Sequence, residues 1–150
     1  DLRGIEAYSC AGILGVDTIA IPSGVTYIDD FAFYGCETLQ YADFGESSDL
    51  KSIGRYAFWD CLALKEAVLP EGLETIEENV FSGCKSLSKL VFPSTIRSIG
   101  TWIAYGAVDL TEATYRGSVE EWEAMEKDDE WHYRTSCAVV HCQNGDVLLA

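Results

Sequence analysis

The chain repeats itself with a period of about 23 residues, and this period constrains the fold more than any other feature of the sequence. Successive steps of 23, 25, 23 and 23 residues separate the leucine-like positions Val16, Leu39, Leu64, Leu87 and Leu110. The longer step places two additional residues in the polar segment Gly45–Asp49. A unit of this size cannot bury its own apolar side, so successive units must stack and share one core. The period therefore predicts a solenoid.

Each repeat carries the same kinds of side chain at the same places. Four columns, in chain order, hold Leu2, Val25, Leu50, Leu73 and Ile96; Ile5, Ile28, Ile53, Ile76 and Ile99; Cys10, Phe33, Phe58, Phe81 and Ala104; and Ile13, Cys36, Cys61, Cys84 and Ala107. We expect the three phenylalanines to stack in one buried column. We also expect a short helical turn between Ile28 and Cys36, because Phe33 and Cys36 are three residues apart and share a helical face.

Apolar residues alternate with other residues after each leucine-like position, as they do in half-buried strands. This pattern predicts short strands at 18–21, 41–44, 66–69, 89–92 and 112–115. Because each repeat contributes one strand, the strands should form a parallel sheet along one side of the solenoid, with neighbouring strands about 4.8 Å apart.

Three segments, Ala32–Cys36, Ala57–Cys61 and Val80–Cys84, share the phrase Ala/Val-Phe-x-x-Cys. Together with the isoleucine and leucine columns, this phrase resembles the BspA-like, or Treponema-type, leucine-rich repeats of surface proteins. The resemblance implies an α/β fold: a leucine-rich-repeat solenoid of about five turns over residues 1–115. It also implies an extracellular or cell-surface location, and the relatives include bacterial adhesins that bind host matrix proteins.

The last 35 residues, 116–150, lack the repeat and are expected to form a cap. Ser118 and Glu121 have the spacing of a capping box, which predicts a helix start. Asn144-Gly145 is a hairpin signal, and pairing across it places Val140, Cys142, Val147 and Leu149 on one face. At the other end Leu2 and Ile5 occupy inward columns with no strand before them, so we expect the sequence to be part of a longer protein.

Composition excludes several classes of partner. The 150 residues contain 25 acidic and 10 basic side chains, a formal net charge of −15, which repels nucleic-acid backbones and anionic lipid surfaces. No run of apolar residues is long enough to cross a membrane. We therefore expect neither nucleic-acid binding nor a membrane span in this segment.

The sequence offers few side chains that could form a catalytic or metal site. Cys36, Cys61 and Cys84 share a column with alanine and isoleucine, so we expect buried thiols that fill space, and repeats without a histidine offer no base to activate them. His132, Cys137, His141 and Cys142 have the side-chain types of a zinc site, but a strand at this place would turn His141 and Cys142 to opposite faces. Asp128-Asp129-Glu130 lacks the spaced ligands and the turn glycine of a calcium loop. We expect no catalytic residues, no metal and no cofactor.

The outward positions of the strands form one candidate binding surface, which contains Tyr41, Glu66, Val68, Lys89 and Val91. Two valines expected to be exposed, beside a tyrosine and charges, give the apolar centre and polar rim of a protein contact. The alternative surface is an aromatic stripe on the turns, which contains Tyr34, Trp59 and Tyr105 and suits stacking on sugar rings. Mutual shielding of these rings on the convex side is the simpler explanation of the stripe.

Two functions fit these observations. The first is a non-enzymatic extracellular binding or adhesion module that recognises a protein or glycan partner, such as a host matrix or cell-surface protein, through the repeat surface. The second is a structural spacer domain within a larger surface protein.

Overall fold

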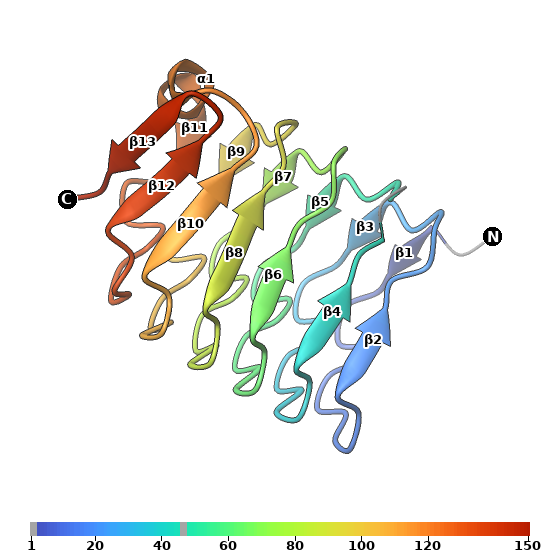
Figure 1. Ribbon diagram of the computed structural model, residues 1–150. Coiled ribbons are helices and arrows are strands. Elements are labelled where there is room, and N and C mark those ends of the chain that lie inside the picture. The colour runs from blue at the N-terminus through green and yellow to red at the C-terminus, as the bar shows by residue number, and fades with distance from the viewer. Residues whose placement is uncertain (1–2, 46–47) are drawn as a thin grey trace.

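The computed structural model describes residues 3–45 and 48–150, which wind into a solenoid (Figure 1). Two sheets run along its length, one behind the other in Figure 1, and each coil contributes one strand to each sheet. The α/β solenoid expected from the repeat is confirmed. Leu2, and residues 46 and 47 of the lengthened segment, lie outside the described residues.

The front sheet in Figure 1 contains the strands expected from the alternating pattern. Its order is β13-β12-β10-β8-β6-β4-β2. The bounds are β2 (Thr18–Ala20), β4 (Tyr41–Asp43), β6 (Glu66–Val68), β8 (Lys89–Phe92), β10 (Glu112–Tyr115), β12 (Val139–Cys142) and β13 (Gly145–Leu148). All neighbours are parallel except β12 and β13, which form the hairpin.

The rear sheet was not expected from the sequence. Its order is β1-β3-β5-β7-β9-β11, and every strand has two residues: Gly4–Ile5, Tyr27–Ile28, Ser52–Ile53, Thr75–Ile76, Ser98–Ile99 and Glu126–Lys127. The inward residue of the four middle strands is the isoleucine of the second column, which is at most 2% exposed. The inward position of this isoleucine column is therefore confirmed, but the strands that contain it were not predicted.

The expected helical turn between Ile28 and Cys36 is wrong. The backbone there makes consecutive turns, and Phe31 has a left-handed conformation with φ of 60°. Tyr8, Tyr56, Asn79 and Trp102 have the same conformation at the equivalent places. These turns direct backbone N–H groups at the next coil, as in the bond from the Phe33 N–H to the Ala57 carbonyl at 2.7 Å. Bonds to the next coil thus alternate with bonds between residues three apart in the same coil, as from the Tyr34 N–H to the Phe31 carbonyl at 3.1 Å.

The core lies between the two sheets and the turns. Phe33 and Phe58 stack with ring centroids 5.0 Å apart, Phe58 and Phe81 with centroids 5.6 Å apart, and all three are at most 4% exposed. The expected buried column is confirmed. Cys36, Cys61 and Cys84 are buried thiols, as expected, and each donates to a backbone carbonyl of the preceding coil at 3.1 to 3.2 Å.

The C-terminal segment begins with the helix α1 (Val119–Ala124), and the capping box of Ser118 and Glu121 is present as expected. Asn144 in the hairpin turn accepts from the Val119 N–H at 2.8 Å and donates to Glu120 at 3.0 Å. Lys127 donates to the Trp122 carbonyl at 2.7 Å, at the C-terminal end of a helix that has no basic residue in its own last turn.

The segment after α1 adds a further coil, because β11 extends the rear sheet and β12 extends the front sheet. Trp131 is 1% exposed and lies against Phe92 and Trp122 at centroid distances of 5.5 and 6.0 Å. The predicted hairpin face is confirmed, since Val140 is buried and Cys142, Val147 and Leu149 pack against the core. The division of the chain at residue 115 stays a prediction.

In the part of the chain that the structure describes, no helix is long and apolar enough to cross a bilayer.

Candidate binding surface

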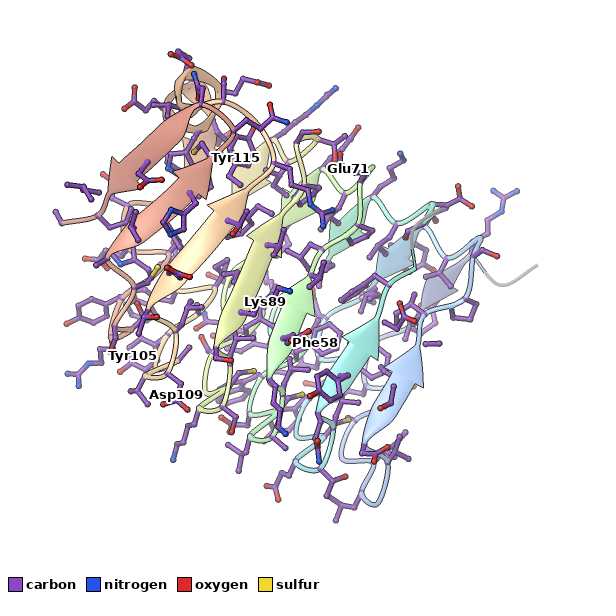
Figure 2. The ribbon with its side chains drawn as sticks, in the orientation of Figure 1. Phe58, Glu71, Lys89, Tyr105, Asp109 and Tyr115 are labelled. Carbon is purple, nitrogen blue, oxygen red and sulfur yellow. The ribbon has the colours of Figure 1, made fainter. Side chains whose placement is uncertain are left out.

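The outward side chains of the front sheet form two rows across the strands. Tyr41, Glu66 and Lys89 lie opposite one another in register on β4, β6 and β8. In the second row Val68, Val91 and Thr114 are paired in the same way. In Figure 2, Lys89 is labelled on β8 near the middle of the front sheet. The register confirms that the predicted residues belong to one sheet.

A hollow with a volume of about 750 Å³ lies on this sheet over the ends of β4 and β6. We call it the front hollow. Its lining consists of Tyr41, Ala42, Asp43, Phe44, Gly45, Glu66, Val68, Leu69, Pro70, Glu71 and Arg116. Phe44 and Leu69 are buried, Val68 is half-buried, and Tyr41 is exposed. The hollow therefore has an apolar base and a polar rim.

The front hollow brings together three of the five predicted site residues: Tyr41, Glu66 and Val68. Lys89 is exposed on the next strand but does not line the hollow. The expectation that Val91 is exposed is wrong, because its exposed fraction is 6%. Val68 and Thr114 flank Val91 on the two neighbouring strands, so it has covering side chains on both sides.

Three rim residues were not selected from the sequence: Asp43, Glu71 and Arg116. Asp43 accepts from the Gly45 N–H at 2.9 Å. Both carboxylate oxygens of Glu71 are held by Ser94, from its N–H at 3.1 Å and from its hydroxyl at 2.8 Å. Arg116 follows β10, three strands away from β4 in the sheet, yet it reaches the same hollow. The lengthened segment after β4 contributes Gly45.

Tyr41 already interacts with a cation. The ammonium nitrogen of Lys65 lies 5.9 Å from the centroid of the Tyr41 ring, which is within the range of a cation–π contact. Tyr41 is 40% exposed. Its ring thus offers a partner both apolar area and a face that attracts positive charge.

The alternative aromatic stripe consists of two ladders of neighbouring rings. Phe31 stacks on both Tyr8 and Tyr56 with centroids 4.9 Å apart, and Tyr34 stacks on Trp59 at 5.0 Å. Tyr105 lies in a second group with Trp102 and Tyr133, at 5.6 and 5.9 Å. Asn79 and Ser82, both nearly buried, separate the two groups. Phe31 thus has a ring on each face, whereas Tyr8 and Trp102 are 58% and 38% exposed.

The environment of the cysteine column shifts the pKa values of its thiols. Burial raises the pKa of Cys84, and interaction with the Cys36 thiol together with burial raises the pKa of Cys61. A thiol with a raised pKa is protonated at neutral pH and is a poor nucleophile. Cys61 and Cys84 therefore contribute packing and thiol hydrogen bonds, whereas the side-chain hydrogen bond with Cys61 lowers the pKa of Cys36, at the N-terminal end of the column, to about 7.

His141 is part of a polar cluster that joins three strands. Its Nδ1 lies 2.8 Å from Asp146 on β13, and its Nε2 lies 3.0 Å from Glu112 on β10. Both ring nitrogens are therefore engaged with carboxylates. In residues 3–45 and 48–150, no group of three or more histidine, cysteine or carboxylate side chains has an arrangement that could hold a metal ion.

Residues 3–125 match the BspA type leucine-rich repeat region in six copies. Because the match covers most of the chain, the protein belongs to this family. Among curated proteins, none has a sequence similar enough to count as a relative.

Solved structures share the fold. A leucine-rich repeat protein of T. pallidum, TpLRR, is 29% identical with a TM-score of 0.68, and the match covers 72% of this chain and 50% of that one. A leucine-rich cell surface protein of Faecalibacterium prausnitzii is 24% identical with a TM-score of 0.64, covering 75% and 35%. The pneumococcal vaccine antigen PcpA is 22% identical with a TM-score of 0.67, covering 90% and 32%. This chain thus spans half or less of their lengths.

Proposed function

We propose that this chain is a non-enzymatic binding module of an extracellular or cell-surface bacterial protein, and that it docks a protein partner through the front hollow. The observation that carries the proposal is the hollow itself, where Val68 and Tyr41 lie among charged side chains from two neighbouring coils and from Arg116. An apolar centre within a polar rim is the usual anatomy of a protein contact.

The rigidity of the front sheet supports the same surface. Tyr41, Glu66 and Val68 project from strands that are paired on both sides, so their backbone is already ordered before a partner arrives. Binding there avoids the entropy cost of ordering a loop. The aromatic ladders are the second candidate surface, for a glycan, but a sugar stacks on the face of a ring, and both faces of the central Phe31 ring are occupied by Tyr8 and Tyr56.

The cell-surface part of the proposal is drawn from the family and from the printed description of one structural relative as a cell surface protein. A spacer role, in which the coils only separate other domains, is the alternative. It predicts that no partner binds any face of the isolated chain with useful affinity.

A screen for partners tests the proposal. The labelled chain is applied at micromolar concentration to arrays of extracellular-matrix proteins, cell-surface glycoproteins and free glycans. Each partner found is then measured against two double variants, Tyr41→Ala with Val68→Asp and Tyr34→Ala with Trp59→Ala, after thermal melts show that both fold. We expect the first pair to abolish binding and the second to preserve it. Loss in the second pair only would assign binding to the aromatic ladders, and no retention of any partner would favour the spacer.

A further inference from the structure

The front hollow is lined by charged groups, and their arrangement indicates which kind of segment it accepts. Asp43, Glu66 and Glu71 place three carboxylates around it, and Arg116 places one guanidinium. In the described part of the chain, neither Glu66 nor Arg116 forms an ion pair within 4 Å. Among the lining residues negative charges thus outnumber positive ones three to one, with Lys65 over the Tyr41 ring and Lys89 opposite Glu66 beside the hollow. The net charge of the whole chain is −15.

We propose that the hollow binds an extended segment of a protein partner in which a lysine or arginine side chain lies next to a small aliphatic residue. This inference rests on the proposed function and names the chemistry of the partner. The cationic side chain lies between Asp43 and Glu66, and the aliphatic residue packs on Val68.

Tyr41 supports an occupant with a long aliphatic stem. Its ring is in contact with the Lys65 ammonium group at 5.9 Å, and 40% of the residue remains exposed. The stem of an arginine or lysine from a partner can cover the exposed part of the ring while its charged group reaches the carboxylates.

The hydrogen-bond donors of Arg116 favour a partner segment in an extended conformation. Its side chain has five N–H donors in a planar fork, and an extended segment presents backbone carbonyls at regular intervals along the hollow. Glu71 is held in place by Ser94 from the next coil, so this carboxylate of the rim is preorganised. A partner segment rich in aspartate or glutamate would instead face three carboxylates, an unfavourable arrangement.

The test uses two sets of short fluorescein-labelled peptides, which alternate valine with either lysine and arginine or glutamate. Binding to the chain is followed by fluorescence anisotropy at low and at physiological ionic strength. We expect the cationic peptides to bind, with an affinity that weakens as salt is added, and the acidic peptides not to bind. Failure of every cationic peptide to bind at low salt would overturn the inference.

A matched pair of charge variants localises the contact. Asp43→Asn with Glu66→Gln removes two charges from the hollow, and Glu77→Gln with Glu123→Gln removes two charges from exposed positions outside it. We expect the hollow pair to weaken binding about tenfold or more, because charge-assisted contacts are lost. The control pair should weaken it less than about twofold, through net charge alone. Equal losses in the two pairs would mean unspecific attraction and would overturn the inference.

The proposed function can survive a failure of this inference. If a partner from the screen loses binding with Tyr41→Ala and Val68→Asp but binds the hollow charge pair normally, the front hollow remains the docking site. The cationic segment is then excluded.

Discussion

The first and the last coils of the solenoid both lie at an end, but their core columns differ sharply in burial. In the first coil the column residues Ile13 and Val16 are 43% and 37% exposed, and their neighbour Leu14 is 64% exposed. In the last coil Trp131 and Cys137 are 1% and 7% exposed, because α1 and the β12–β13 hairpin lie over the end of the core. The comparison shows that a column position alone does not bury a side chain. Burial requires a neighbour on both sides.

The two ends also achieve different polar contacts. At the C-terminal end, Asn144 and Lys127 supply side-chain partners to both termini of α1. In the first coil, Gly15 donates to the Thr38 hydroxyl at 2.9 Å, a contact with the following coil. In a stacked repeat, stability is close to a sum of repeat terms and nearest-neighbour terms. Single substitutions at the two ends and in the middle should therefore lower the free energy of unfolding by different amounts.

The largest effect should come from the middle of the core. Phe58 is fully buried and contacts Phe33, Phe81 and Phe44 at centroid distances of 5.0, 5.6 and 6.1 Å. We expect Phe58→Ala to reduce the free energy of unfolding by about 3 to 5 kcal/mol, because it leaves a cavity between two coils. Urea denaturation followed by circular dichroism measures this loss. A variant with the stability of the parent would contradict the shared aromatic column.

An intermediate effect should come from the cap. Asn144→Ala removes the acceptor for the Val119 N–H and the donor to Glu120. We expect a loss of about 1 to 2 kcal/mol, as for other residues that satisfy a helix N-terminus, and faster hydrogen exchange of the α1 amides. The matched control is Gln143→Ala, since Gln143 is the exposed neighbour in the same turn. Equal losses for the two variants would show that the turn, and not the Asn144 side chain, supports α1.

The features that could be predicted from the sequence are those specified by local periodicity. Phe33, Phe58 and Phe81 recur at a fixed column, the front strands alternate, and Ser118 with Glu121 is a pattern within four residues. The candidate site was predicted only in part, because burial on a sheet depends on neighbouring strands. Val91 is covered by Val68 and Thr114, and which residues flank it is decided by register.

Other features depend on the path of the whole chain. Arg116 reaches the front hollow from the end of β10, and no local pattern relates it to Tyr41 or Glu66. The rear strands have two residues each, which is too short for alternation to appear. The last coil was missed as a coil because α1 interrupts the period, and because Lys127 pairs with Ile99 where the other rear strands place isoleucine.

A smaller effect should come from a substitution in the first coil. Val16 and Leu64 occupy the same column, but Val16 is 37% exposed and Leu64 is fully buried. We expect Val16→Ala to cost less than about 1 kcal/mol and Leu64→Ala about 2 to 5 kcal/mol, since only the buried site loses both transfer energy and packing. Thermal and urea unfolding of the two variants give the comparison. A loss for Val16→Ala as large as that for Leu64→Ala would mean that the first coil is more completely covered than the structure shows.

The smallest effect should be a pH dependence of the stability that His141 gives to the β12–β13 hairpin. The hydrogen bonds to Glu112 and then to Asp146 raise the pKa of His141 above its usual value of 6.5. A histidine with a raised folded pKa contributes stability that is fully present below the unfolded pKa and is lost as pH rises through the folded pKa. His141→Gln should therefore destabilise the chain most just below pH 6.5, while the carboxylates are still ionised, and least in alkaline solution. The effect should shrink with added salt, because the group is exposed.

His132 provides a control of opposite sign on the same coil. Burial lowers the pKa of His132, so the contribution of its neutral form is present above the unfolded pKa and is lost as pH falls. His132→Gln should remove part of the acid sensitivity of the fold, whereas His141→Gln should remove stability that acid supplies. Unfolding midpoints of the parent and both variants, measured across neutral pH at two salt concentrations, separate the two. If the loss of stability caused by His141→Gln is the same at every pH, the charge of His141 contributes nothing to stability. The side chain then supports the hairpin only through packing and uncharged hydrogen bonds.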